Sequence, residues 1–133
     1  MHAAIERLLP ERIHEEACKA SMAKHIEGEA LRERLISMKE RWPAIRERVS
    51  RQLVSPERAA TMLRMAGAPH HPDLIGIDWD RFRETHLKAN LIRSRYTVLE
   101  LLVETGQFDA VTERLFAPAG FWGRHRCPET LGF

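Results

Sequence analysis

The sequence predicts an all-α protein, and three observations lead to this fold class. Apolar residues return every three or four positions over most of the chain, which is the period of an amphipathic helix. No stretch alternates apolar and polar residues, and no Asn-Gly or Asp-Gly pair marks a hairpin. Prolines, glycines and capping residues divide the chain into segments. We expect one compact helical domain of five to seven helices over residues 1–116, followed by an irregular tail over residues 117–133.

Size and composition indicate a single soluble domain without an obvious charged partner. The chain has 133 residues, which suits one domain. Its 21 basic and 19 acidic residues nearly balance, so the sequence gives no electrostatic reason to bind nucleic acid. No apolar run reaches the roughly 20 residues of a membrane span. Because Cys18 and Cys127 form no CxxC pair and no signal peptide is evident, we expect a reduced, cytoplasmic location.

The first half of the chain predicts two shorter helices and one long one. Residues 3–9 form a helix that breaks at Pro10, and a second helix covers about residues 11–26 before Gly28. One apolar stripe then marks a long helix: Leu31, Leu35, Met38, Trp42, Ile45, Val49 and Leu53. Pro43 lies inside this stripe and removes a backbone hydrogen bond. We expect a bend near residues 41–42 or a new helix that begins at Pro43.

Capping residues define the helix that follows. Ser55 suits an N-cap, and Pro56 suits the first turn because its missing N–H has no partner there anyway. Gly67 suits the left-handed position just past the helix end. Residues 68–77 then predict a loop bounded by prolines.

The last third of the chain predicts three more helical segments with clear limits. Asp78 is placed to cap the first of them. The apolar stripe of that segment consists of Phe82, Leu87 or His86, Ala89 and Ile92. Thr97 and Glu100 match the capping box Thr-x-x-Glu, and Gly106 ends the helix that they start. A short helix follows over residues 108–116, and we expect Phe121 and Trp122 to anchor the tail.

The seven histidines offer a weak indication of metal chemistry. No two of them are spaced to share a helix face as metal ligands, and no HExxH occurs. A small metal-binding protein that uses His70, His71 or His86 is one alternative. The other interpretation is that His86 is a hydrogen-bonded histidine within its helix. We assign no catalytic residue, no cofactor-binding residue and no metal ligand.

The motif IRSRYT at residues 92–97 allows two interpretations. Arg93 and Arg95 carry guanidinium groups that suit phosphate, and the following helix presents free N–H groups at its start. Alternatively, the arginines cap the preceding helix or pair with Glu84 or Glu100, and Tyr96 fills a junction between helices. Together with His86, these residues are our candidates for a polar junction or a ligand-facing surface: Arg93, Arg95, Tyr96 and His86.

Four motifs in the second half of the chain occur together in one known family. They are AGAP at residues 66–69, IGI at residues 75–77, IRSRYTVLELL at residues 92–102 and GQFD at residues 106–109. The stretch from about Thr61 to Phe116 resembles the C-terminal helical domain of the sn-glycerol-1-phosphate dehydrogenase family, within the iron-containing alcohol dehydrogenase-like superfamily. The resemblance implies the fold of the C-terminal half of dehydroquinate synthase-like enzymes.

The resemblance also implies a parent activity that this sequence does not contain by itself. Full-length members reduce dihydroxyacetone phosphate with NAD(P)H and a divalent metal, zinc or nickel, and their metal histidines include one followed by glycine. This sequence has no Gly-rich dinucleotide loop and no His-Gly pair, so no ligand is carried over and we expect no cofactor in this chain. We expect a remnant that begins just after the second metal ligand and is inactive alone.

An apolar helix face that once packed against the rest of such an enzyme would be exposed in this chain alone and has to be buried in an interface. We expect a homo-oligomer or a partner protein to provide it, and we expect no nucleic acid or membrane as partner. The alternative is a stand-alone interaction or regulatory module that has reused the same helical fold. Both hypotheses predict association through that helix face.

Overall fold

The computed structural model describes residues 2–128, and all of their regular secondary structure is helical. In chain order the elements are α1 (His2–Leu8), the 3-10 turn η1 (Glu11–Ile13), α2 (His14–Met22), α3 (Gly28–Gln52), α4 (Pro56–Met65), the 3-10 turn η2 (Pro72–Ile75), α5 (Trp79–Lys88), α6 (Val98–Glu104), α7 (Phe108–Phe116) and α8 (Phe121–Arg124). Seven of these α-helices have seven residues or more, in line with the five to seven expected. The predicted all-α class is confirmed for the described residues.

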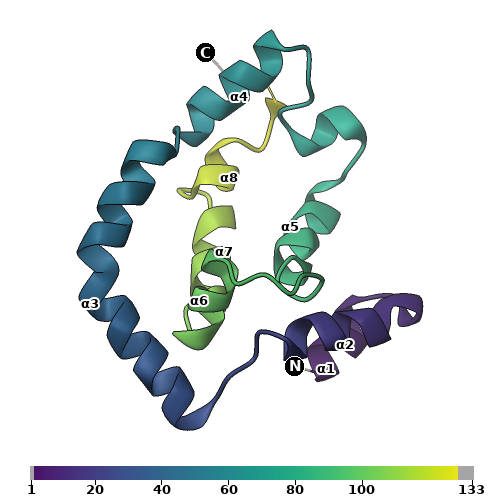
Figure 1. The fold of residues 1–133 in the computed structure, drawn as a ribbon. Coiled ribbons are helices and arrows are strands. Elements are labelled where there is room, and N and C mark those ends of the chain that lie inside the picture. Colours follow the sequence, from purple (N-terminus) through teal and green to yellow (C-terminus); the bar gives the residue numbers. More distant parts are fainter. Residues whose placement is uncertain (1, 129–133) are drawn as a thin grey trace.

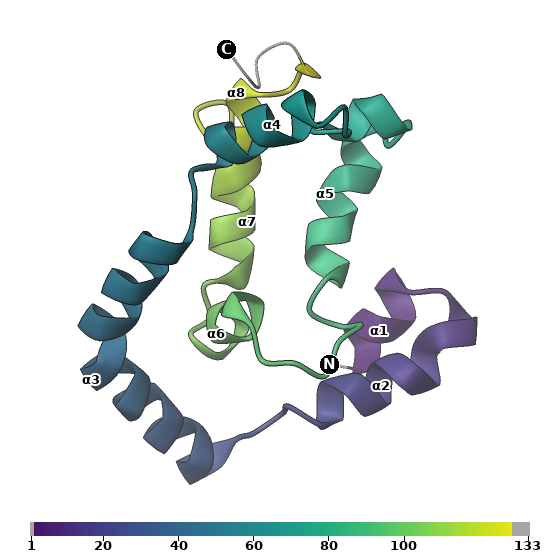
Figure 2. The same cartoon turned by 45° about the horizontal axis from the view of Figure 1, so that its top comes forward.

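The helices form a loose arrangement rather than a closed bundle, with α6, α7 and α8 stacked between α3 and α5 (Figure 1). α1 and α2 pack together at one end, and α5 and α7 run beside each other through the middle. α3 is a long outer arm that leads from the α1–α2 pair to α4 at the opposite end, as the turned view also shows (Figure 2). The arrangement leaves α3 with little protein against it.

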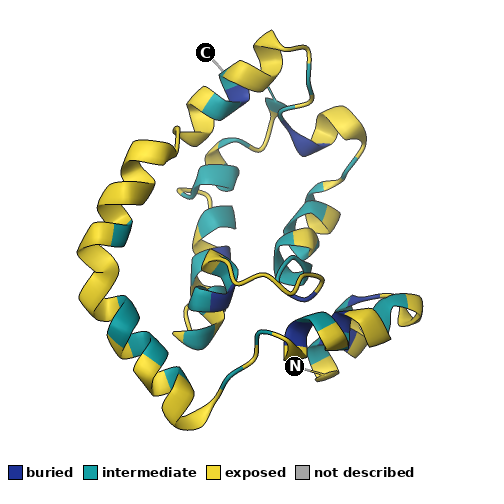
Figure 3. Cartoon of the chain, in the orientation of Figure 1, coloured by how far each residue is buried: buried dark blue, intermediate teal, exposed yellow. Residues whose placement is uncertain are grey.

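The hydrophobic core is small and lies at the α1–α2 end. It consists of Ile5, Leu9, Ala17 and Leu91, and among the described residues Ile5 is the one large side chain that is fully buried. The chain exposes 9842 Å², whereas a compact protein of 15.4 kDa exposes roughly 7,200 Å². Buried residues are correspondingly sparse in Figure 3. The expectation of a compact domain is therefore corrected.

α3 is continuous over 25 residues and contains no buried residue. It passes through Pro43 without a break, so of the two expected outcomes the new helix at Pro43 is wrong. The helix changes direction near its middle, in line with the other expectation of a bend (Figure 1). Pro43 is exposed, so water can hydrate the Lys39 carbonyl that loses its helical partner. Solvent exposure is the reason that this proline bends the helix without ending it.

The predicted caps are confirmed at three helix starts. The Ser55 side chain accepts from the Arg58 N–H at 3.2 Å, and the Asp78 carboxylate accepts from the Arg81 N–H at 2.9 Å. At α6 the capping box is complete: the Thr97 hydroxyl accepts from the Leu99 N–H and the Glu100 carboxylate accepts from the Thr97 N–H. These local hydrogen bonds explain why the sequence alone located the starts of α4, α5 and α6.

One predicted boundary and one predicted stripe need correction. α2 ends at Met22, not at residue 26. α5 ends at Lys88, so helical spacing no longer applies further on: Ile92 is 51% exposed, and Leu91 enters the core instead. A stripe that is extrapolated beyond a helix end gives the wrong buried residue.

The tail is more ordered than the sequence predicted. Residues 121–124 form α8, and residues 129–133 lie outside the described residues. Gly120 and Gly123 let α8 approach the end of α7, because a Cβ at Gly120 would overlap the Arg114 carbonyl and one at Gly123 would overlap the Ala117 carbonyl. Trp122 then packs edge-on against Phe82 of α5, with ring centroids 4.7 Å apart.

Candidate functional site

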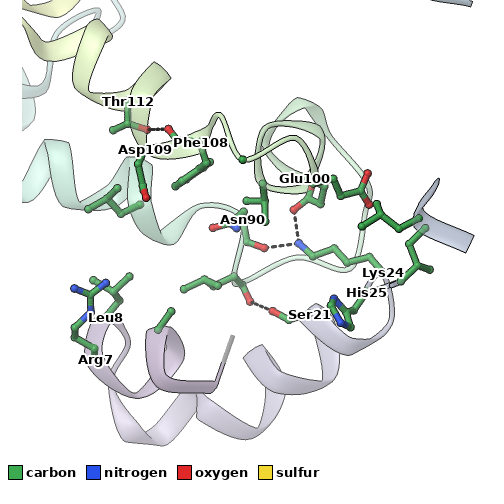
Figure 4. Close-up of a pocket in the computed structure, with 18 of the residues that line it drawn as sticks. Arg7, Leu8, Ser21, Lys24, His25, Asn90, Glu100, Phe108, Asp109 and Thr112 are labelled. Carbon is green, nitrogen blue, oxygen red and sulfur yellow. Dashed lines mark hydrogen bonds and ion pairs between the residues drawn. The ribbon is translucent and has the colours of Figure 1, made fainter. Parts of the chain in front are cut away.

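A cavity of about 820 Å³ lies between the N-terminal helices and the α5–α7 region. Its apolar lining consists of eight side chains: Ala4, Leu8, Ile26, Leu31, Leu87, Leu91, Val103 and Phe108. Polar groups gather on the side where the α2 end faces α6 (Figure 4). A concave, largely apolar space with a few convergent polar groups is the usual form of a small-molecule site, and the bonds of these groups decide whether they are available to a ligand.

Lys24 is the centre of the polar side. Its ammonium group lies 2.5 Å from a Glu100 carboxylate oxygen, and it also donates to the Asn90 backbone carbonyl (Figure 4). Both charged side chains are 9% exposed. Next to them the Ser21 hydroxyl donates to the Leu91 carbonyl at 3.3 Å. Together these bonds fasten the end of α2 to the turn between α5 and α6.

Glu100 is held in its charged form. Burial by itself disfavours the carboxylate, but hydrogen bonds from the Lys24 ammonium and from the Thr97 hydroxyl and N–H outweigh it, so the pKa of Glu100 lies below its ordinary value. The same carboxylate therefore completes the α6 capping box and neutralises Lys24. Its hydrogen-bonding capacity is used within the protein.

A second polar junction ties α3 to α6. The Arg34 guanidinium lies 2.7 Å from one Glu104 carboxylate oxygen, and the Tyr96 hydroxyl donates to the other at 2.6 Å. The Arg34 guanidinium also lies over the Tyr96 ring, 4.9 Å from its centroid. Burial and the bond to Glu104 raise the pKa of Tyr96 to about 12. Tyr96 thus lies at the edge of a junction between α3 and α6, with its hydroxyl on Glu104 and its ring beneath Arg34.

The remaining charged groups of the cavity lining do not form a catalytic arrangement. Arg83 pairs with Glu113 between α5 and α7. Arg7 and Asp109 are exposed to solvent. The buried charges are thus paired with one another, which is the pattern of a structural ion-pair network.

Two of the arginines named from the sequence behave differently from the prediction. Arg93 and Arg95 are exposed and make no ion pair with other residues of the described chain. Glu84 instead pairs with Lys88 at 2.9 Å, and Glu100 pairs with Lys24. The expected pairing of the arginines with these glutamates is therefore wrong. Short i,i+4 spacing favours Lys88 for Glu84.

His86 occupies an aromatic setting on α5. Its Nδ1–H donates to the Phe82 carbonyl at 3.0 Å, one turn earlier in the helix. Its ring meets the rings of Phe82 and Phe116 edge-on, with centroid distances of 4.8 and 5.0 Å. The interpretation of His86 as a hydrogen-bonded histidine within its helix is confirmed.

The adjacent pair His70 and His71 does not converge on one point. His71 is buried; its Nε2–H donates to the His125 carbonyl at 3.0 Å, and its Nδ1 accepts from the Asp73 N–H at 3.3 Å. His70 is only half-buried. Within residues 2–128, no three His, Cys, Asp or Glu side chains are grouped to hold a metal ion. His71 thus joins the η2 loop to the residue that follows α8.

Sequence reasoning missed Lys24, Arg34 and Glu104, which carry the two polar junctions. The ion pairs Lys24–Glu100 and Arg34–Glu104 join residues 76 and 70 positions apart, and no local pattern signals such a pairing. Over the described part of the chain, no helix is long and apolar enough to cross a membrane. Comparisons with protein-family models, with curated protein sequences and with solved structures found no match for this chain. What the protein does must therefore be argued from its own contacts and exposed surfaces.

Proposed function

We propose that this chain is a docking domain, in which α3 packs against a second folded unit. One observation carries this proposal: α3 spans 25 residues, presents an apolar stripe and buries none of them. A helix of that length gains most of its stability from packing of its apolar face. Exposed apolar area of this extent marks an interaction surface in a soluble protein.

The exposed residues are the anchor types that interfaces use. Trp42 in the middle of α3 is 46% exposed, and Val49 further along is 42% exposed. Leu53 and Val54, in the connection to α4, are 70% and 46% exposed. The total exposed surface exceeds that of a compact chain by an area that a stable interface can cover. A partner along α3 would bury all four side chains.

The resemblance of residues 61–116 to sn-glycerol-1-phosphate dehydrogenases suggests which unit docks. In that family the helical domain works with a nucleotide-binding domain. Hydride transfer from NAD(P)H to dihydroxyacetone phosphate requires the cofactor, the carbonyl and a Lewis-acid metal to be held together. We propose that the partner domain supplies NAD(P) and the zinc or nickel site, and that this chain completes the helical side of the cleft.

The experiment that tests this proposal is co-expression. The chain is produced with the remainder of a dehydrogenase of that family, which comprises the nucleotide-binding domain and the first part of the helical domain with both metal histidines. The pair is examined by size-exclusion chromatography with light scattering. We expect a one-to-one complex and NADH oxidation with dihydroxyacetone phosphate, and no oxidation by the chain alone. A clear rate from the chain alone would contradict the proposal.

The same measurement separates two kinds of docking domain. A complex that forms without NADH oxidation would favour the stand-alone interaction module over the dehydrogenase. A chain that stays monomeric at high concentration and forms no complex would contradict the proposed docking function itself.

A further inference from the structure

The sequence of α3 contains a seven-residue repeat of apolar and charged residues. Three consecutive groups of seven residues share one pattern: LRERLIS at 31–37, MKERWPA at 38–44 and IRERVSR at 45–51. In each group the first and fifth residues are apolar, the second and fourth are basic, and the third is glutamate. Apolar residues repeated every 3.5 positions form the seam of a coiled coil.

On a helix this pattern places the three kinds of residue on different sides. The apolar residues form one narrow seam: Leu31, Leu35, Met38, Trp42, Ile45 and Val49. Basic residues line both edges of that seam: Arg32, Arg34, Lys39, Arg41, Arg46 and Arg48. The glutamates lie on the opposite side: Glu33, Glu40 and Glu47. The seam is therefore bordered by positive charge along its whole length.

The structure shows what one of these edge residues does when another helix is present. Arg34 reaches across to α6 and pairs with Glu104 at 2.7 Å. Further along α3, where no helix lies against the seam, Lys39, Arg41 and Arg46 are exposed and form no ion pair within residues 2–128. The next edge residue, Arg48, is in the same state. These four unpaired basic side chains border the half of the seam that contains Trp42 and Val49.

We propose that the occupant of this seam is an α-helix of a partner protein with its own apolar seam bordered by Asp or Glu. The proposal rests on the docking function above and names the chemistry of the surface that docks. In a coiled coil the edge residues of one helix pair with those of the other, and opposite charges there select the partner. The partner would do at Arg41 and Arg48 what Glu104 does at Arg34.

Charge makes a second copy of this chain a poor occupant. In a parallel pair the edge residues at the two sides of the seam face each other, and in an antiparallel pair each side faces its own equivalent. Both arrangements bring Arg or Lys against Arg or Lys, because both edges of α3 are basic. A membrane surface fits less well, because an interfacial helix has a broader apolar face than a seam of two positions in seven.

A designed peptide tests the inference directly. The probe is a fluorescently labelled helical peptide of three heptads with leucine in the seam and glutamate at every edge position; the control peptide has lysine at those positions. Fluorescence anisotropy with the full chain should show binding of the glutamate peptide and at least about tenfold weaker binding of the lysine peptide. Raising the salt concentration to 0.5 M should weaken the glutamate peptide alone.

Matched variants locate the binding on α3. Arg41→Glu/Arg48→Glu should weaken the glutamate peptide about tenfold and strengthen the lysine peptide. Arg12→Glu/Arg81→Glu makes the same change of net charge at exposed positions off α3 and should leave both affinities unchanged. Circular dichroism of each variant confirms that it is folded before binding is measured.

Each other outcome has a definite meaning. Equal affinity for the two peptides, binding only to vesicles that contain anionic phosphatidylglycerol, or saturation of the seam by self-association would overturn the inference. If the nucleotide-binding domain still forms its complex and Arg41→Glu/Arg48→Glu leaves it intact, the docking function stands and the acidic partner does not. If neither peptide binds and no complex forms, both fail.

Discussion

Lys24, just past the end of α2, and Glu100 in α6 form an ion pair of 2.5 Å, with both side chains 9% exposed. The two residues are 76 positions apart in the sequence. Because the hydrophobic core is confined to the α1–α2 end, this pair and the neighbouring Lys24 bond to Asn90 are the main polar link between that end and the α5–α6 region. The pair thus joins two parts of the fold that are far apart in the sequence.

Replacement of Lys24 by methionine should strongly destabilise the chain. The change leaves the buried Glu100 carboxylate without its counter-ion, and loss of one partner of a buried pair costs about 3 kcal/mol. The measurement is the free energy of unfolding from urea denaturation. Lys19→Met, at an exposed position of α2, is the matched control and should change it by less than about 0.5 kcal/mol. Equal stability of the two variants would mean that the pair does not hold the fold.

The same pair predicts loss of stability in acid. The pKa of Glu100 in the folded protein lies below its ordinary value of 4.5. Its contribution to the free energy of unfolding is therefore complete above the unfolded-state pKa and is lost as the pH falls through the lower folded-state pKa. Urea denaturation over a pH series should show this decrease, and Glu100→Gln should make it shallower. Identical pH profiles for the two proteins would contradict the prediction.

Tyr96 offers a direct optical test of the α3–α6 junction. It is the single tyrosine of the chain, so absorbance at alkaline pH reports its ionisation alone. The midpoint should lie at about 12 and should move toward the ordinary value in Glu104→Gln. Because the folded-state pKa is raised, the junction stabilises the protein fully below the unfolded-state pKa and loses its contribution as the pH rises through about 12.

The control for that titration is another glutamate that pairs with an arginine. Glu113→Gln breaks the pair with Arg83 between α5 and α7, away from the tyrosine. It should leave the Tyr96 midpoint unchanged. A midpoint for Tyr96 near the ordinary value of 10.0 in the unmodified chain would show that the junction does not form in solution.

Substitutions in the core should lower stability, whereas substitutions in the α3 seam should weaken association. Ile5→Ala removes the fully buried side chain of the core and should lower the free energy of unfolding by about 3 kcal/mol. Trp42→Ser, at a half-exposed seam position of α3, should change it by less than about 0.5 kcal/mol yet abolish binding to the partner unit. Urea denaturation and light scattering of the complex measure the two effects. A large loss of stability in Trp42→Ser would place that side chain in the fold instead of the interface.

Much of the secondary structure was predictable because its signals are local. Asp78 contacts the backbone N–H three residues later, and Thr97 and Glu100 bond to each other across one turn. Such bonds form wherever the residues occur at that spacing. The continuity of α3 through Pro43 was not predictable, because it depends on whether the freed carbonyl meets water or protein.

The contacts of the candidate site could be predicted only in part. Tyr96 was identified from the sequence, but its partners Arg34 and Glu104 were not. Arg93 and Arg95 are close to Tyr96 in the sequence and carry the same charge as Arg34, yet both are exposed in the structure. Residue type and spacing name the groups able to form a polar junction; which of them meet depends on how distant helices are oriented.

The sequence by itself determined the helical class, the caps and the composition of the α3 seam with its basic edges. These features depend on periodicity and on contacts within a turn. Only the tertiary structure decided that the core is confined to the α1–α2 end, that Lys24 meets Glu100, and that α3 meets α6 at Arg34 but buries none of its residues. The physical reason is that an amphipathic helix carries the same apolar stripe whether it is covered or exposed, and the packing of the remaining helices determines which of the two it is. IRSRYT accordingly contributes a tyrosine to the α3–α6 junction, and the exposed seam of α3 is the surface that we propose a partner covers.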